Sequence, residues 1–100
     1  MTTIFYKQPR EVFDYFIDMR DYFKEYEGDK ILSANDVTIE ILPAGELTND
    51  GVVLNNAGDD GFTIWLSGGI DRGRYKVTML INTEEGRVEE AEIEIRIKEV

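Results

Sequence analysis

The C-terminal third of the chain has the clearest alternation of hydrophobic and polar residues. Over residues 74–82, one face carries Tyr75, Val77, Met79 and Ile81. Over residues 88–98, one face carries Ala91, Ile93, Ile95 and Ile97. A period of two is typical of a half-buried strand, with one face in the core and the other in water. Residues 83–87 place Gly86 late in a short loop, so the two strands are predicted to form the final antiparallel hairpin.

Shorter strands separated by turns are predicted upstream of this hairpin. The expected strand segments are residues 31–34, which begin one strand, and residues 37–41 and 52–54. Pro43 ends the second of these, and residues 48–51 are interpreted as a turn. Residues 55–61 are rich in Asn, Asp and Gly, which predicts a loop.

The segment that follows Pro9 fits two patterns. One is a strand over residues 11–19, followed by a short helical turn near residues 20–27. One face of that strand would carry Phe13, Tyr15 and Ile17. The other pattern is one helix from Pro9 to Tyr26, because proline is accepted at a helix start and hydrophobic residues also recur here at helical spacing. Periodicity alone leaves both patterns open.

The middle of the chain combines a strand, a glycine corner and a second strand. Trp65, the only tryptophan, lies on the first strand and is predicted to pack between two sheets. Gly68 and Gly69 follow at a sharp reversal, where glycine tolerates a positive φ. Tyr75 begins the second strand, where its ring can be buried while its hydroxyl finds a backbone partner.

Many short strands joined by Gly and Asn turns are typical of a β-sandwich. We therefore predict an all-β fold, an immunoglobulin-like antiparallel β-sandwich of about seven strands. With 100 residues, the chain has the size of one domain, over residues 1–100.

The chain contains neither cysteine nor histidine, and its formal net charge is −10. The first fact excludes disulfides, thiolate metal sites and catalysis by a Ser-His or Cys-His pair. The acidic charge repels phosphates, so we expect no nucleic-acid partner. It either keeps the protein in solution or complements a basic partner. No segment has the length of a membrane span or the pattern of a signal peptide, so no membrane contact is expected.

Two groups of acidic residues are candidates for a cation site. Glu90, Glu92 and Glu94 share one face of a strand, but a flat row lacks the carbonyl ligands of calcium sites, so a solvated outer face is expected. The Gly58-Asp59-Asp60 loop does not fit the spacing of an EF-hand. We predict no metal site and no cofactor, and the sequence leaves open whether this loop binds a cation.

Paired carboxylates are also what a glycosidase needs. The candidate pairs are Asp14 with Asp18 and Asp59 with Asp60. A sandwich of this size leaves little room for a substrate cleft. We therefore predict no catalytic residue.

Five motifs follow one another over residues 9–98, almost the whole chain. They are Asp14-Tyr15 with Asp18, Gly28-Asp29-Lys30-Ile31-Leu32-Ser33, Trp65-Leu66-Ser67-Gly68-Gly69, Tyr75-Lys76-Val77-Thr78 and Thr83-Glu84-Glu85-Gly86-Arg87-Val88-Glu89-Glu90. In this order and spacing the chain resembles the small acidic β-sandwich proteins of tailed bacteriophages, which are fiber-tail adaptors and related virion structural proteins. The segment Asp21–Glu27 departs from the family pattern because it is more aromatic and more charged. The resemblance favours a strand over residues 11–19.

The resemblance implies a non-enzymatic virion structural protein of the tail or head-tail region, assembled in the host cytoplasm. Its partners would be other virion proteins, in a symmetric multi-copy assembly, with no nucleic acid and no membrane. From the residues themselves, the candidate interface side chains are Arg72, Arg74 and Arg87, because exposed arginine is common in protein interfaces. For Arg87, a structural pairing with Glu85 or Glu89 is the alternative.

A second function stays open at this stage. A β-sandwich on a fiber tip or capsid surface could bind carbohydrate, with Trp65 and the tyrosines as a stacking platform. An exposed Trp65 would favour this function, and a buried one would count against it.

Overall fold

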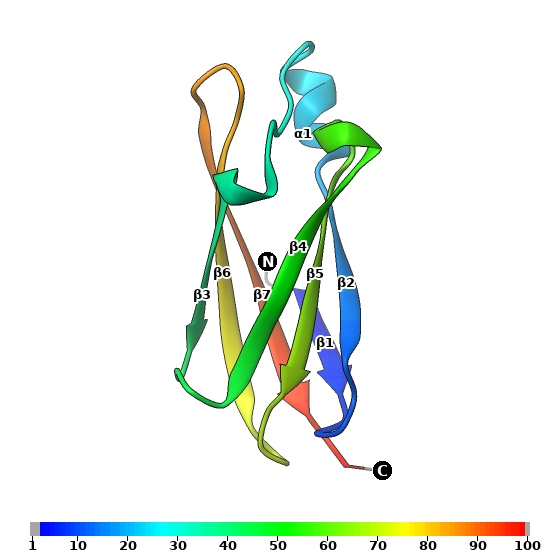
Figure 1. The fold of residues 1–100 in the computed structure, drawn as a ribbon, viewed down its shortest axis with the longest axis vertical. Helices are drawn as coiled ribbons and strands as arrows, with labels where there is room; N and C mark the ends of the chain where they lie inside the picture. Colours follow the sequence, from blue (N-terminus) through cyan, green and yellow to red (C-terminus); the bar gives the residue numbers. More distant parts are fainter. Residues whose placement is uncertain (1–2, 100) are drawn as a thin grey trace.

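Two β-sheets pack face to face in the computed structural model, which describes residues 3–99 (Figure 1). The strands are β1 Thr3–Lys7, β2 Phe13–Asp18, β3 Val37–Leu42, β4 Leu47–Asn55, β5 Gly61–Gly68, β6 Arg74–Asn82 and β7 Val88–Ile97. The helical segments are α1 Arg20–Glu25 and two short 3-10 turns, η1 Ala34–Asp36 and η2 Asn56–Gly58. The helical segments and the β6–β7 hairpin gather at one end of the elongated molecule, the upper end (Figure 1). The β5–β6 loop lies at the opposite, lower end.

The strand order confirms the predicted all-β sandwich. One sheet has the order β1-β7-β6-β3 and the other β2-β5-β4. All pairings are antiparallel except that of β1 with β7. This is the order of an immunoglobulin-like sandwich in which β1 lies at the edge of the four-stranded sheet, beside the last strand.

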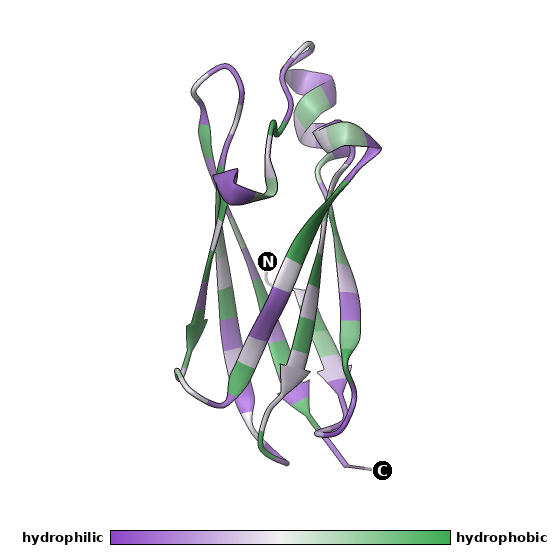
Figure 2. Ribbon diagram, in the orientation of Figure 1, coloured by the Kyte–Doolittle hydropathy of each residue, from purple (hydrophilic) through white to green (hydrophobic). Residues whose placement is uncertain are grey.

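The core lies between the two inner faces. Figure 2 shows hydrophobic and hydrophilic residues alternating along the strands. The largest fully buried side chains are Tyr75, Phe62, Ile31, Ile64, Leu66, Met79, Ile81, Ile95 and Val77. Burying each of them contributes roughly 1.5–3 kcal/mol of hydrophobic free energy, which offsets the entropy lost on ordering the chain. The final hairpin forms as predicted, with Gly86 at φ +89° in its loop.

The region after Pro9 is a strand followed by a short helix, and the continuous helix is wrong. β2 pairs with β5 along its whole length, which buries Tyr15 and Ile17. α1 then buries Phe23 at the upper end of the core. A single helix would have left the β5 edge without a partner.

Trp65 does not pack between the sheets, and that prediction is wrong. Its side chain is 39% exposed, whereas Phe62, Ile64 and Leu66 on the same strand are fully buried. Because successive side chains of a strand point to opposite faces, burying these three turns Trp65 outward. Three hydrophobic residues outweigh one in setting the register of β5.

Two other segments differ from the prediction. Residues 31–34 form no strand, because the N–H of Ile31 donates instead to the carbonyl of Gly58 at 3.1 Å. Residues 48–51 form no turn, since β4 is continuous and carries a bulge between Asn49 and Gly51.

β1 was absent from the prediction. Its sequence, Thr-Ile-Phe-Tyr-Lys, has consecutive hydrophobic residues instead of an alternation. Its strand conformation depends on pairing with β7. Across residues 3–99, no helix combines the length and the hydropathy needed to span a membrane.

The glycine corner and the tyrosine behind it are as predicted. Gly68 and Gly69 have φ of +79° and +95°, and a side chain on Gly69 would meet Ile97 at 2.7 Å. The Tyr75 ring is fully buried, and its hydroxyl accepts the N–H of Ile70 at 3.0 Å. The hydroxyl also donates to the Glu46 carboxylate at 2.5 Å, so the corner is tied to β6 and to the loop before β4.

Candidate interface surfaces

The outer face of the β2-β5-β4 sheet carries a cluster of exposed hydrophobic side chains, which we call the aromatic face. It consists of Phe16, Val53 and Trp65, which are 42%, 56% and 39% exposed. Phe16 and Val53 are the register partners of Thr63 from opposite sides, and Trp65 follows two residues later on β5. Residues two apart on a strand share a face, and cross-strand diagonals lie about 7–8 Å apart. The three side chains therefore form one patch.

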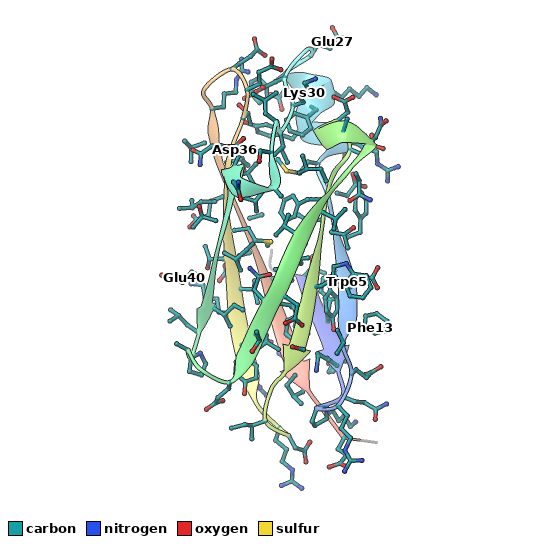
Figure 3. The ribbon with its side chains drawn as sticks, in the orientation of Figure 1. Phe13, Glu27, Lys30, Asp36, Glu40 and Trp65 are labelled. Atoms are coloured by element: carbon teal, nitrogen blue, oxygen red, sulfur yellow. The ribbon has the colours of Figure 1, made fainter. Side chains whose placement is uncertain are left out.

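Trp65 lies on β5, on the side of the sheet that faces away from the core (Figure 3). Its register partner on β4 is Gly51, and no atom lies within 4 Å of where a Gly51 side chain would begin. Its partner on β2 is Asp14. The indole is therefore flanked by a gap on one side and a carboxylate on the other, which leaves room for a group that contacts both.

A charged pair borders the aromatic face at the upper end. Arg20 binds Asp18 through two side-chain hydrogen bonds of 2.9 and 2.7 Å, and its guanidinium lies 5.9 Å from the centre of the Phe16 ring. These hydrogen bonds lower the pKa of Asp18 to about 2. The rim of the patch is thus polar and ionised, as in the rims of many protein interfaces.

At the upper end, the Arg87 side chain is held by contacts with other residues of the chain. Its guanidinium donates to Asp29 at 2.9 Å and to Glu85 at 3.3 Å, and it lies 4.5 Å from the centre of the Tyr26 ring. The predicted pairing with Glu85 is confirmed, and Asp29 is an additional partner. Arg87 remains partly exposed, so its interface role stays a prediction.

Asp29 is the centre of this upper cluster. Its side chain is fully buried and accepts hydrogen bonds from the backbone N–H groups of Lys30 and Glu85, at 2.9 and 3.1 Å, and from Arg87. Burial alone would raise the pKa of Asp29, but these bonds and one from the Thr83 hydroxyl lower it overall. Asp29 therefore joins the loop after α1 to the β6–β7 hairpin.

A pocket of about 430 Å³ lies beside this cluster. It contains both Asp59 and Asp60 of the predicted loop, together with Arg20, Lys24 and Lys30. Between residues 3 and 99, no group of three or more acidic side chains is placed to hold a metal ion. Glu94 and Glu92 of the other acidic row bind Arg96 and Lys76.

At the lower end, basic side chains gather around an open pocket of about 400 Å³, which we call the basic pocket. Its basic residues are Arg72, Arg74, Arg96 and Lys98, and its wall includes Tyr6. The structure thus brings the predicted Arg72 and Arg74 together and places Arg87 at the opposite end. Arg96, Lys98 and Tyr6 were missed. The predicted hairpin contained a signal for one of them, because a loop over residues 83–87 already sets Arg74 opposite Arg96.

Comparison with known proteins gives one assignment. The family described as podophage GP4 fiber-tail adaptor protein gp77 matches residues 7–96. No curated protein is similar enough in sequence to count as a match. The family match covers β2 to β6, nearly all of β7 and the aromatic face, and it agrees with the all-β sandwich. The chain therefore belongs to the podophage fiber-tail adaptor family Gp77, a family of phage virion structural proteins.

Proposed function

We propose that the chain is a non-enzymatic adaptor that docks on a neighbouring tail or fiber protein of the virion through its aromatic face. The observation that carries this proposal is the exposure of Phe16, Val53 and Trp65 on the outer face of a sheet whose inner face packs into the core. Large aromatic side chains grouped on a surface mark protein contacts, and tryptophan is enriched among the residues that dominate binding energy.

The surroundings of Trp65 indicate the chemistry of the partner. Asp14 lies opposite Trp65, and Asp50 is the extra residue of the bulge beside it. An arginine or lysine of the partner could stack on the indole and pair with these carboxylates. We therefore expect a partner surface that is hydrophobic with at least one basic residue, in line with the net charge of −10.

The paired carboxylates are poorly placed for glycoside hydrolysis. Asp14 and Asp18 share the outer face of β2 four residues apart, a separation of about 13 Å along a strand. Retaining and inverting glycosidases need carboxyl groups roughly 5–9.5 Å apart. Asp18 is also engaged by Arg20. These distances support an assembly role, and we expect several copies related by symmetry in the virion.

The test is incorporation into particles. A phage that lacks the gene is complemented with the wild-type chain, with Trp65→Ala or with Leu80→Ala, and the purified virions are quantified by mass spectrometry. Leu80 is similarly exposed, at 42%, on the other sheet and serves as the matched control. We expect Trp65→Ala to lower incorporation about tenfold or more while Leu80→Ala does not, since a tryptophan anchor contributes about 2 kcal/mol or more. Absence of the wild-type chain from virions would overturn the adaptor role, and normal incorporation of Trp65→Ala would overturn the docking face.

The exposure of Trp65 also favours carbohydrate binding as a second candidate function. Trp65 is the only tryptophan, so its fluorescence reports directly on any ligand stacked on it. The wild-type chain is titrated with host surface polysaccharide while the emission is followed. A saturable shift that Phe16→Ala weakens would favour this function, and an unchanged spectrum would count against it.

A further inference from the structure

We propose that the basic pocket is a second docking site, which binds carboxylate side chains of an acidic segment from another virion protein. It lies at the lower end, on the outer side of the β1-β7-β6-β3 sheet, and is separate from the aromatic face. That the partner is a virion protein rests on the adaptor role proposed above. That the pocket binds carboxylates rests on the geometry of the pocket alone.

Three side chains line up across three strands at this site. Tyr6 of β1 is the register partner of Arg96 of β7, and Arg96 is the register partner of Arg74 of β6. Directly paired side chains have Cβ atoms about 4.5–5.5 Å apart. Arg74 and Arg96 therefore lie side by side, and Arg72 and Lys98 line the same pocket.

Most of the positive charge of this pocket is not compensated by ion pairs within residues 3–99. Among residues 3–99, Arg72, Arg74 and Lys98 form no ion pair. Arg96 binds Glu94 through Nε and also hydrogen-bonds Tyr6, and since a guanidinium carries five N–H donors, some of them remain for a ligand. Like charges directly opposite on paired strands are destabilising. Glu94 offsets the charge of Arg96 but leaves that of Arg74 unpaired, so an anion bound beside Arg74 would be stabilising.

The acidic residues of the pocket do not neutralise it. Asp71 accepts the backbone N–H of Glu99 at 3.0 Å, so its carboxylate holds the end of the chain against the loop. Glu99 itself lies on the exposed wall of the pocket. Four basic and two acidic side chains leave a net positive pocket on a protein whose net charge is −10.

The pocket is also held rigidly. The N–H of Arg72 donates to the carbonyl of Ile97 at 2.8 Å, and the N–H of Ile97 donates to the carbonyl of Gly73 at 2.9 Å. These bonds hold Arg72 at φ +69°, an uncommon value for a residue with a side chain. A pre-ordered site loses less entropy when a ligand binds.

Carboxylates are the ligands that fit this chemistry. The planar guanidinium of arginine binds a carboxylate through two parallel hydrogen bonds, and the pocket brings several arginines together. Phosphates share this geometry, but a nucleic acid carries a charge at every nucleotide and a second copy carries −10 in all, so the field of this acidic protein repels both more strongly than it repels a short acidic segment. We therefore assign the pocket to an acidic segment of a different chain.

The test measures binding of a fluorescent hexaglutamate peptide to the full-length protein by anisotropy. The double variant Arg72→Gln/Arg74→Gln removes two charges from the pocket, and Lys24→Gln/Lys30→Gln removes two charges from the upper end as the matched control. We expect the pocket variant to weaken binding about tenfold or more and the control variant less than about twofold, because charge-assisted contacts are lost only in the first. Equal weakening in both variants, or no binding to the wild type, would overturn the proposal.

Two further arms separate the alternatives. Tighter binding of a fluorescent single-stranded DNA than of hexaglutamate would assign the pocket to nucleic acid and overturn the proposal. Concentration-dependent self-association in sedimentation, abolished by Arg72→Gln/Arg74→Gln, would assign it to a second copy with the same consequence. Trp65→Ala should bind hexaglutamate as the wild type does, so a failure of the aromatic face leaves this test unaffected.

Discussion

The two ends of the sandwich use arginine in opposite ways. At the upper end, Arg87 is bound by two carboxylates and stacked on Tyr26, so its charge holds the loops together. At the lower end, Arg72 and Arg74 have no ion-pair partner in the described part of the chain and face another arginine. An arginine whose charge is already paired within the molecule has few donors left for a partner protein. An unpaired arginine opposite a like charge is stabilised when an anion binds.

The largest effect is expected from removing the acidic centre of the upper end. Asp29→Ala leaves several donors without an acceptor and should lower the free energy of unfolding by about 3 kcal/mol. Asp71→Ala at the lower end removes one exposed hydrogen bond and should cost less than about 0.5 kcal/mol. Urea denaturation followed by tryptophan fluorescence measures both. Equal losses would show that the two ends do not differ in this way.

The same contrast should depend on pH. The pKa of Asp29 lies below its ordinary value of 3.8 in the folded protein, so the unfolded chain takes up a proton first as pH falls. The stabilisation by Asp29 is therefore complete above pH 3.8 and is lost as pH falls through the lowered value. Asp29→Asn cannot titrate, so its stability deficit relative to the wild type should shrink over this range. A deficit that stays constant down to pH 2 in urea titrations would contradict this assignment.

The smallest expected effects are shifts of the urea midpoint in opposite directions for two arginine substitutions. Arg87→Ala removes the partner of Asp29 and should lower the urea midpoint. Arg74→Ala removes the like charge opposite Arg96 and should leave the midpoint unchanged or raise it. Low-salt buffer should enlarge the difference, because screening weakens both effects. A lower midpoint for Arg74→Ala would mean that this arginine stabilises the fold and is not held open for a partner.

Local patterns predicted most of the fold. The alternation over residues 74–98 and the loop with Gly86 were sufficient for the final hairpin and its register. The same reasoning applied to β5 would have turned Trp65 outward, because Phe62, Ile64 and Leu66 alternate with it. The error came from treating the size of one side chain as stronger than the period of the strand.

The rest depends on contacts between distant parts of the chain. Asp29 and Arg87 are 58 positions apart, and the sequence around either residue does not indicate that the two form an ion pair. The basic pocket needs β1 beside β7, and β1 has no alternation that would identify it. The pairing with Glu85, two residues away, was predictable because both residues lie in one hairpin loop.

The parallel pairing of β1 with β7 also has a consequence for how the protein is made. Thr3 pairs with Ile93, so β1 has no partner in this sheet until the residues between it and β7 have been synthesised. Contacts between such distant residues slow folding, because a large loop must close before they form. We therefore expect β1 to dock late in folding, and until it docks the backbone edge of β7 is exposed to any extended segment nearby.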